Sequence, residues 1–589
     1  MVDEEEQKAD APEAPAAAPV KGKGMWIGIV VVVIVIVILL VAVFGGLFGQ
    51  PPARKYQIDL WYNNDGHYGD TEDELATVLK NQIEACGKIG VTLRNDPWAV
   101  YRTNWAQGLM DVFLLGWYPD YFDSDDYISP FLSTSGAASL GSFYTNTTVD
   151  GWITQEQTTT NPATRAARFT DIQGSLADDV PYVPLFSGNA HVAYVNGITD
   201  VELHPVSFKW FIMDKPGSNE INASTTDKII SLDPASAYDY FSIEVINQVF
   251  DTLLVYEPVT ATLMPGLAQQ VPTVANGLVS ADGLNYTYRL KPGVTFHDGT
   301  ALNATVVARS IDRAIRLNIG GSAAFLLYDV GALGRDATNG NNTPVGRIEV
   351  HPGNMNITFH LPRAVSFFND LMAFSVSAPV PWNYNQAGEQ PSTVPNVVGS
   401  GPYRLTQHTA NLLVVLDRYA TYHTPNLYAG LGIATIPVED KVTINIRLTA
   451  TALKQDIETH AASGIDVIYR TLTPTDLTDL LGRAATLGIT VDVGSGPQIR
   501  YLVINVNRVP EVAARQAIAY SVNRAEIDTL VFEGTAEPLY SMIPSNMPYH
   551  EPVFNTVYGG LPNCTAANNL LTQLGFSIRL SGIWIARDR

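Results

Sequence analysis

The stretch MDVFLLGWYPDYFDSDDYISPF, residues Met110 to Phe131, joins a short apolar run to a loop of aromatic and acidic residues. The run from Val112 to Leu115 has the length and the β-branched and aromatic content of a buried strand. We predict that the loop after Gly116 forms the wall of a ligand cleft, where rings supply contact area and one desolvated carboxylate holds a cationic group. A solvated acidic turn after a core strand is the alternative that composition leaves open. The loop contains Trp117, Tyr118, Tyr121 and Phe122 as rings and Asp120, Asp123, Asp125 and Asp126 as carboxylates.

Length, charge and cysteine content restrict the class of protein. A chain of 589 residues can form two lobes or more after its N-terminal segments. The formal charge of −22 argues against nucleic acid as a partner, because phosphate binding needs a basic surface. Cys86 and Cys564 are too few for a metal cluster. A disulfide between them is an option outside the cell, and free, small core residues are the simpler interpretation.

The sequence lacks the motifs of catalysis and of cofactor binding. It contains no His-Glu-x-x-His, Cys-x-x-Cys or Gly-x-Ser-x-Gly motif, which excludes the common metal, redox and nucleophile sites. Gly399-Ser400-Gly401 is followed by a proline and a strand, so it cannot cradle phosphate at a helix N-terminus. The acidic pairs between Asp123 and Asp126 would need a pKa raised by burial to act as general acids. We therefore predict a protein without enzymatic activity, cofactor or metal site, and a membrane-anchored glycosidase is the weaker alternative.

The N-terminus predicts a membrane anchor. Residues 1–24 are rich in Ala, Pro and Glu, which predicts a disordered acidic tail. Met25 to Phe48 contains no charged or strongly polar side chain. As a helix this run spans about 36 Å, enough to cross a hydrocarbon core of about 30 Å. We predict an uncleaved single-pass anchor with the large domain outside the cell, and a cleaved signal peptide is the alternative.

From Tyr56 onward the pattern is α/β. Strands are predicted at 56–62, 91–94, 112–115, 181–186, 191–195, 286–290, 294–296, 442–448 and 501–506, and helices at 72–87, 161–177, 241–254, 304–316 and 511–532. Between the two halves, Asp214 to Asp227 has the Pro, Gly, Ser and Asn content of a linker.

The stretch YRLKPGVTFHDGTALNATVVARSIDRA runs from Tyr288 to Ala314. It is similar to the Leu-Lys-x-Gly-Val-x-Phe-x-Asp-Gly signature of the family 5 extracellular solute-binding proteins of ABC importers, which include the oligopeptide- and dipeptide-binding proteins, and several other segments also resemble this family. Together the similar segments cover nearly everything from Tyr56 to about Phe576. Further similarity lies at Asn247–Tyr256, Val398–Leu405, Ala514–Ile527, Ile89–Val91, Trp98, Asp111, Gly116–Trp117, Pro119–Tyr121 and Arg165–Pro184.

The resemblance implies a type II clamshell of two α/β lobes that closes on a ligand and signals its occupancy to a permease. In peptide-binding members the Asp of the Trp-x-x-Asp-Tyr motif receives the peptide's amino group, and that position is Asp120 here. Leu114 and Trp105 stand near where some members carry arginines for the peptide carboxylate, so carboxylate recognition and peptide length stay open. The predicted ligand-binding residues are Asp120, Trp117, Trp98, Tyr118, Tyr121 and Asp123.

The order of the similar segments differs from the family. Segments that come last in the family come first here, which predicts a circular permutation closed within one chain. The linker at 214–227 would bridge the old ends, and a truncated tandem protein completed by another chain is the rival account. The predicted divisions are the tail at 1–24, the transmembrane helix at 25–48, lobe II at 56–186 and 497–576, a crossover at 187–213, the linker, lobe I at 228–496 and an unmatched tail at 577–589.

The predicted function is that of a membrane-anchored, extracellular component of an ABC importer. It would bind oligopeptides or dipeptides between its lobes and deliver them to the permease subunits. The alternatives are an oligosaccharide-binding protein of the same family and a ligand-free surface or structural protein on this fold.

Overall fold

The computed structural model describes residues 55–574 apart from residues 66, 69–70, 205 and 335–346. Lys55–Phe576 forms one compact unit. The predicted acidic tail, the predicted transmembrane helix and the tail at 577–589 lie outside the described residues. None of the helices in the described part of the chain combines the length and the apolar character that a membrane span requires.

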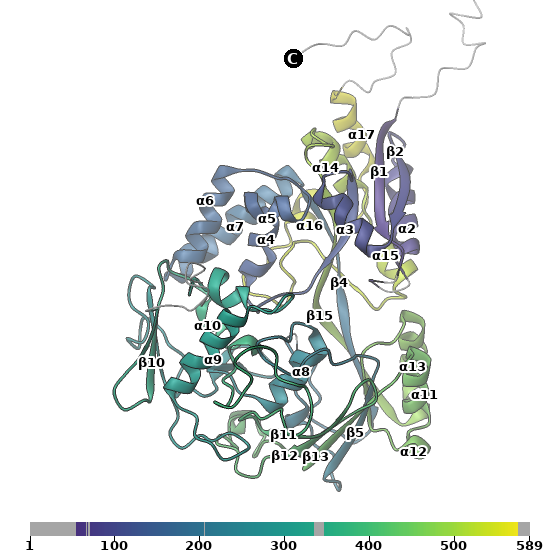
Figure 1. Ribbon diagram of the computed structural model, residues 1–589. Helices are drawn as coiled ribbons and strands as arrows, with labels where there is room; N and C mark the ends of the chain where they lie inside the picture. The colour runs from purple at the N-terminus through teal and green to yellow at the C-terminus, as the bar shows by residue number, and fades with distance from the viewer. Residues whose placement is uncertain (1–54, 66, 69–70, 205, 335–346, 575–589) are drawn as a thin grey trace, which may run out of the picture. The chain divides into compact units, whose positions relative to one another are not determined.

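One mixed sheet of eleven strands runs through the unit in the order β11-β12-β13-β5-β14-β4-β15-β3-β1-β2, with β16 paired to β4. The antiparallel strands β4 and β15 are long and pair along most of their length, so they connect the two halves of the sheet (Figure 1). The strands are β1 Tyr56–Asn63, β2 Ile89–Asp96, β3 Val112–Trp117, β4 Tyr182–Val195, β5 Glu220–Thr225, β11 Tyr403–Thr409, β12 Leu413–Arg418, β13 Lys441–Ile446, β14 Val467–Tyr469, β15 Ile489–Ile504 and β16 Glu537–Pro538.

Lobe II is the part of the unit held by one cluster of buried residues, which draws on the segments from Ile58 to Phe186 and from Ile499 to Leu571. Val112 to Leu115 are all buried, as expected of a strand that is covered on both faces. Strands β1, β2 and β3 are parallel, and helices cover them (Figure 1). The helices are α2 Glu72–Ala85, α3 Trp98–Ala106, α4 Ser129–Leu132, α5 Thr134–Ser139, α6 Thr147–Thr158, α7 Pro162–Asp179, α14 Val512–Ser521, α15 Arg524–Val531, α16 Val553–Tyr558 and α17 Cys564–Gln573.

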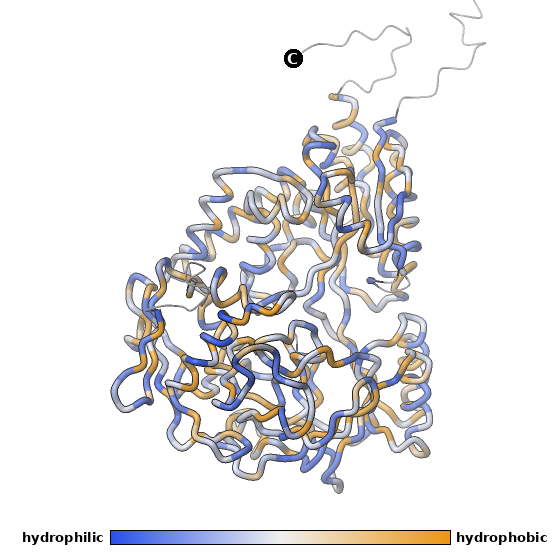
Figure 2. The backbone as a smooth tube through the Cα atoms, viewed as in Figure 1, coloured by the Kyte–Doolittle hydropathy of each residue, from blue (hydrophilic) through white to orange (hydrophobic). Residues whose placement is uncertain are grey.

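Lobe I is the part held by three further clusters, whose members lie between Val192 and Ile489 apart from Tyr121 of lobe II. Its helices alternate apolar and hydrophilic residues (Figure 2), as expected of helices that bury one face. The helices are α8 Tyr240–Val249, α9 Ala304–Leu317, α10 Phe368–Leu371, α11 Ala450–Glu458, α12 His460–Ser463 and α13 Pro474–Leu487. Small sheets are formed by β6 Leu254–Tyr256 with β7 Leu263–Pro265, and by β8 Asn285–Arg289, β10 Asn356–His360 and β9 Ile348–Val350.

The predicted linker at 214–227 contains a strand. β5, Glu220–Thr225, lies between β13 and β14 in the large sheet. Its polar residues misled the sequence interpretation, because Ser224 and Thr225 are buried with partners that lie far away in the sequence. The hydroxyl of Ser224 donates to Asp456 at 2.6 Å, and that of Thr225 donates to the carbonyl of Arg470 at 2.9 Å. Similarly, the two strands predicted at 181–186 and 191–195 form the single strand β4.

The prediction of free cysteines is wrong. Cys86, at the end of α2, forms a disulfide with Cys564, at the start of α17, with a Cα–Cα distance of 4.7 Å. Asn568 Nδ2 donates to the carbonyl of Cys86 at 2.7 Å, and Lys88 Nζ donates to the carbonyl of Asn568 at 3.2 Å. The first and last described segments of the chain therefore lie side by side in lobe II (Figure 1).

Candidate ligand-binding cleft

Two sets of parallel strands end at a common cleft. In lobe II, β1 runs parallel to β2 and β3, and in lobe I, β5 runs parallel to β13 and β14. Ligands of open α/β sheets bind beyond the carboxyl ends of such strands. Tyr118 follows β3 and Arg470 follows β14, and Arg470 Nη2 donates a hydrogen bond to Tyr118 Oη at 3.3 Å. The carboxyl ends of both strand sets therefore face one site.

A cavity of about 410 Å³ lies at this site, within the range of about 300–1,000 Å³ that is usual for small-ligand pockets. The loop after β3 forms one wall, and the start of α8 forms another. Its lining residues are Tyr118, Pro119, Asp120, Tyr121, Phe122, Val206, Tyr238, Asp239, Tyr240, Ile243, Tyr256, Phe374 and Pro497. The wall is thus mostly aromatic, with a small number of carboxylates.

Asp120 is the half-buried carboxylate of this aromatic wall. Its Oδ1 accepts a hydrogen bond from the hydroxyl of Tyr238, which belongs to lobe I. Burial raises the pKa of Asp120 to about 6, and the hydrogen bond from Tyr238 opposes this rise. No Lys, Arg or His in the described part of the chain forms an ion pair with Asp120. An unpaired carboxylate among rings is the arrangement that attracts a ligand cation.

The other carboxylates of the loop are held by the protein itself. Asp123 forms a bidentate ion pair with Arg165, with N–O distances of 2.8 and 2.5 Å. Its side chain also accepts a hydrogen bond from the backbone amide of Asp125 at 2.8 Å. Asp126 is buried and accepts a hydrogen bond from the amide of Asp120, and burial raises its pKa well above the usual range. Asp123 and Asp126 therefore shape the loop from behind and do not line the cavity.

The predicted aromatic residues divide between the cavity and its surroundings. Tyr118 lines the cavity and is 41% exposed. Tyr121 also lines it, stacks on Phe367 of lobe I at a centroid distance of 4.7 Å, and donates its hydroxyl hydrogen bond to Asp125 at 2.5 Å.

The two predicted tryptophans lie outside the lining. Trp117 packs edge-on against Phe131, with ring centroids 5.3 Å apart. Trp98 stacks on His67 with ring centroids 3.6 Å apart, in an aromatic group that also contains Tyr68. The structure thus brings Asp120, Tyr118 and Tyr121 together at the cavity, whereas Trp98, Trp117 and Asp123 are not among its lining residues. Contact of each residue with a ligand stays a prediction.

The cavity residues of lobe I were missed by the sequence analysis. Tyr238, Asp239 and Tyr240 precede or begin α8, and Asp239 caps that helix by accepting a hydrogen bond from the amide of Ser242 at 3.0 Å. The run Tyr-Asp-Tyr-Phe at 238–241 repeats the aromatic and acidic character of the loop after β3, which is the signal that could have identified it. Arg470 contacts the lining residue Tyr118 without lining the cavity itself; it follows a strand of only three residues, and no sequence pattern distinguished it.

Residues 51–139 and 262–584 match the family model described as bacterial extracellular solute-binding proteins, family 5 middle region. The chain belongs to this family. Membership confirms the family resemblance and the prediction of an extracellular binding protein rather than an enzyme.

The curated relatives of this family 5 protein include glutathione-binding proteins. The glutathione-binding protein GsiB of Pectobacterium atrosepticum is 27% identical over 330 residues, which are 54% of this chain and 55% of the relative. GsiB of Escherichia coli strain K12 is 27% identical over 276 residues, which are 46% of this chain and 47% of the relative. The chain spans about half the length of the curated relatives it matches.

Similar solved structures also include binding proteins. The murein tripeptide binding protein MppA of Escherichia coli is 17% identical, with a TM-score of 0.41 over 61% of this chain and 67% of that chain. The ABC transporter substrate binding protein CtaP of Listeria monocytogenes is 19% identical, with a TM-score of 0.44 over 61% of this chain and 66% of that chain.

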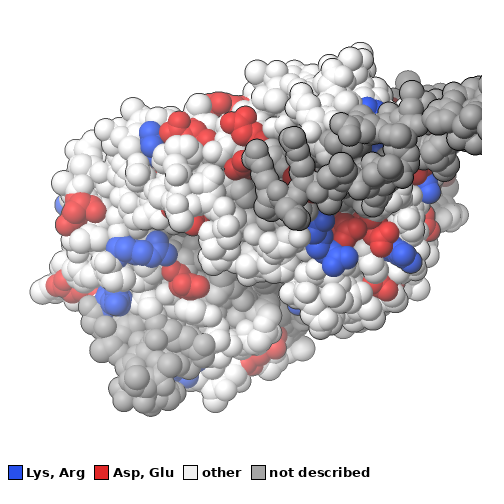
Figure 3. All heavy atoms as spheres, turned by 90° about the horizontal axis from the view of Figure 1, so that it is seen from above, with Lys and Arg blue, Asp and Glu red and all other residues white. Residues whose placement is uncertain are grey.

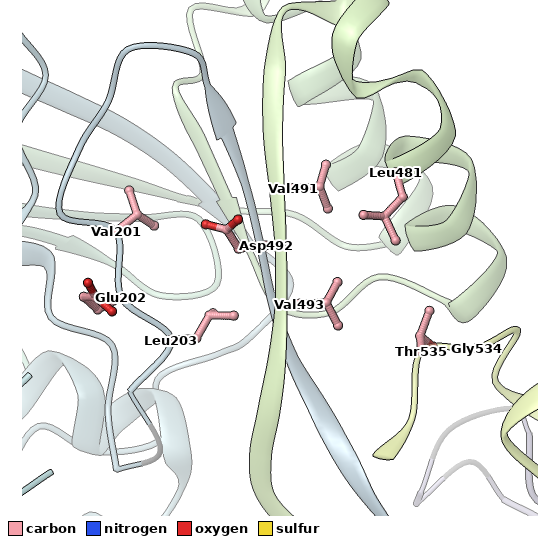
Figure 4. A pocket seen from close by; sticks show the side chains of 9 residues that line it. All are labelled: Val201, Glu202, Leu203, Leu481, Val491, Asp492, Val493, Gly534 and Thr535. Atoms are coloured by element: carbon pink, nitrogen blue, oxygen red, sulfur yellow. The ribbon is translucent and has the colours of Figure 1, made fainter. Parts of the chain in front are cut away.

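This family 5 protein has a second cavity, of about 600 Å³, beside β15 (Figure 4). Asp492 points to one side of the strand and Val491 and Val493 to the other. The pKa of Glu202 is raised by burial and then by its acidic neighbours, including Asp492. The lining residues are Val201, Glu202, Leu203, Leu481, Val491, Asp492, Val493, Gly534 and Thr535. None of these described residues carries a ring or a positive charge, so the aromatic cavity is our candidate ligand site.

On the face drawn in Figure 3, acidic and basic side chains are interspersed in small groups and form no basic patch. In the described part of the chain, no group of three or more His, Cys, Asp or Glu residues is arranged to hold a metal ion.

Proposed function

We propose that this chain captures peptides in the aromatic cavity and delivers them to an ABC permease, while Met25 to Phe48 anchors it in the membrane. The observation that carries the proposal is the unpaired carboxylate of Asp120, which lies in an aromatic cavity between two lobes. A peptide's ammonium group would displace the hydroxyl of Tyr238 and form a charge-assisted hydrogen bond with Asp120. The rings of Tyr118 and Tyr121 would supply apolar contact for side chains of different kinds.

The relatives support a peptide over other solutes. GsiB is named as a glutathione-binding protein, and glutathione is itself a small peptide. We extend this kind of ligand, and not glutathione specifically, to the present chain. Tyr118 and Tyr121 would stack equally well against sugar rings, so oligosaccharides are the comparison class in the test.

The experiment is a thermal-shift screen followed by titration calorimetry with wild type and Asp120→Asn. A ligand at 100 times its Kd adds about 2.7 kcal/mol to the free energy of unfolding, so a binding peptide should raise Tm. Loss of one partner of a buried charge pair costs about 2–5 kcal/mol, so Asp120→Asn should weaken peptide binding by about thirtyfold or more.

The matched control is Asp282→Asn, which changes a carboxylate in an exposed turn of lobe I. It should leave the Kd unchanged. Unchanged peptide binding in Asp120→Asn would remove Asp120 from the site. Response to oligosaccharides alone would select the sugar-binding alternative, and response to neither class would favour a surface protein without a ligand.

We further propose that the chain is a circularly permuted member of the family. One observation supports this proposal: α17, near the end of the described chain, packs beside α14 and is joined to the end of α2, near its beginning, by the Cys86–Cys564 disulfide. In a permuted monomer, that disulfide is intramolecular.

The rival account, a lobe completed by another chain, predicts a different product. Light scattering and non-reducing gel electrophoresis should find a monomer in which Cys86 and Cys564 are linked within one chain. An obligate dimer joined by a disulfide between chains would refute the closed permutation.

A further inference from the structure

The charged residues that line the aromatic cavity are both acidic. Asp120 comes from lobe II and Asp239 from lobe I, and the described lining contains no Lys, Arg or His. Arg470 contacts the lining from outside. Its guanidinium carbon lies 3.8 Å from the ring centroid of Tyr240, and its Nε pairs with Asp227 at 3.5 Å. A single ammonium group on Asp120 would therefore leave a second carboxylate of the cavity without a cation.

Asp239 uses one of its two carboxylate oxygens. Oδ1 accepts a hydrogen bond from the amide of Ser242 at 3.0 Å and so caps α8. Oδ2 is buried and has no hydrogen-bond partner among the described residues. No basic side chain in the described ranges forms an ion pair with Asp239. A buried carboxylate oxygen without a donor costs free energy, which a donor on a ligand would recover.

Other acidic residues also have a buried carboxylate oxygen without a partner, but they differ from Asp239 in place or in charge. Three of them form an ion pair with an arginine. Glu244 accepts a hydrogen bond from Trp210 at 2.7 Å, and burial raises its pKa to about 8, so it is mostly uncharged near neutral pH. None of these described residues lines the aromatic cavity. The set consists of Glu72, Glu156, Asp227, Glu244 and Asp417.

The surroundings of Asp239 favour a cation. Burial raises the pKa of Asp239, hydrogen bonds from Ser242 oppose this rise, and the charge of Asp227 adds to it. A charged group that acts on Asp239 is thus another carboxylate, and a cation placed beside Asp239 would be attracted by both. The tyrosines of the lining also attract cations through the faces of their rings.

We propose that Asp239 forms a second cation subsite and that the preferred ligands are peptides with a lysine or arginine at the first or second position. The inference rests on the proposed peptide function and adds the charge of one side chain. Asp120 receives the amino terminus, and Asp239 receives the cation of the side chain. Tyr238 donates to Asp120 and directly precedes Asp239 in the chain, so both carboxylates are within reach of neighbouring residues of one peptide. The methylene stem of the basic side chain packs against the rings of the lining.

The alternative role of Asp239 is structural, because this residue caps α8. Asn caps a helix about as well as Asp does, so Asp239→Asn keeps the cap and removes the charge. If the role is structural, any loss of affinity in this variant is the same for every peptide. If Asp239 forms a cation subsite, the loss is confined to peptides with a basic side chain.

The experiment is titration calorimetry of the full chain with Lys-Ala-Ala, Ala-Lys-Ala and two counterparts in which norleucine replaces lysine. Norleucine keeps the apolar stem and lacks the ammonium group. Wild type should bind the better lysine peptide about 10- to 100-fold more tightly than its norleucine counterpart, because a hydrogen bond to a charged group contributes about that factor. Asp239→Asn should bind both equally, at about the affinity of wild type for the norleucine peptide. Asp120→Asn should bind both more weakly and keep the preference for lysine.

The matched control is Asp282→Asn. Asp282 also accepts a hydrogen bond from a backbone amide, that of Leu284 at 3.1 Å, and it does not line the cavity. This variant should keep the wild-type preference for lysine.

The outcomes separate the second cation subsite from the peptide function. Equal affinity of wild type for lysine and norleucine peptides would overturn the subsite while leaving the peptide function intact. A preference for lysine that persists in Asp239→Asn would remove Asp239 from the subsite, and an equal loss for both kinds of peptide in that variant would assign a structural role. Binding of none of the four peptides by wild type would overturn the inference together with the proposed function.

Discussion

Peptide binding should weaken as the pH falls through the pKa of Asp120. Burial raises this pKa from its usual value of 3.8 to about 6, against the opposing hydrogen bond from Tyr238. The ionised carboxylate is the form that attracts an ammonium group, and it exists above the pKa. About nine-tenths of Asp120 is ionised at pH 7 and about one-tenth at pH 5, so the Kd should rise about tenfold over this interval. The free amino and carboxyl groups of a peptide keep their charges over the same range.

The assay is calorimetric titration of trialanine at half-unit steps from pH 5 to pH 7, with thermal unfolding at each pH to verify the fold. Asp120→Asn should bind more weakly and show no dependence on pH. Tyr238→Phe removes the hydrogen bond that lowers the pKa of Asp120, so the midpoint of the Kd–pH curve should move to higher pH. The buried neighbour Asp126 has its pKa raised well above the usual range by burial and then by the charge of Asp120, and Asp126→Asn tests its contribution. A Kd of wild type that does not change between pH 7 and pH 5 would refute the reasoning. So would a Kd of Asp120→Asn that still changes with pH at the wild-type midpoint.

Three further outcomes are expected. Replacing Cys86 and Cys564 by Ala should lower the free energy of unfolding by about 2–4 kcal/mol and therefore lower the Tm. Reductant should lower the Tm of wild type in the same way and should not lower the Tm of the variant further. Arg313→Met should lower the free energy of unfolding by about 3–5 kcal/mol, because it leaves Asp233 buried without its partner; the side chains of Arg313 and Asp233 are 2% and 0% exposed. In urea unfolding, adding Asp233→Asn to this variant should restore part of the lost stability. A further loss of stability in the double variant would contradict this account. Protease added to intact cells should remove everything after about Gln50, and a protected large domain would reverse the proposed topology.

Local sequence patterns predicted those strands and helices in which the burial of each side chain follows directly from its polarity. Val112 to Leu115 could be identified as a buried strand because every residue in it is apolar and β3 is covered on both faces. β5 could not, because the hydroxyls of Ser224 and Thr225 are satisfied by groups 232 and 245 residues away. Polar residues in a short segment look like a linker unless their distant partners are known.

The candidate site shows the same limit at the level of single residues. Asp120 and Asp123 are chemically identical and three positions apart, and the sequence alone favoured both as ligand contacts. Arg165, which is 42 residues from Asp123, pairs with it and leaves Asp120 unpaired. Cys86 and Cys564 are 478 residues apart, and only the fold brings them to bonding distance. In each case a contact between distant segments decides the role of the residue.

The ligand-free contacts at the cavity determine what a ligand must offer. Asp120 already accepts a hydrogen bond from Tyr238, and Arg470 already donates one to Tyr118, and both bonds join lobe I to lobe II. A neutral ligand would exchange these bonds for others of similar strength and gain little. A ligand with an ammonium group would replace the hydrogen bond from Tyr238 to Asp120, which has one charged partner, by one in which both partners are charged, so it would gain at that end. The selectivity of this cleft for a charged amino terminus would then arise from the contact that Asp120 makes without a ligand.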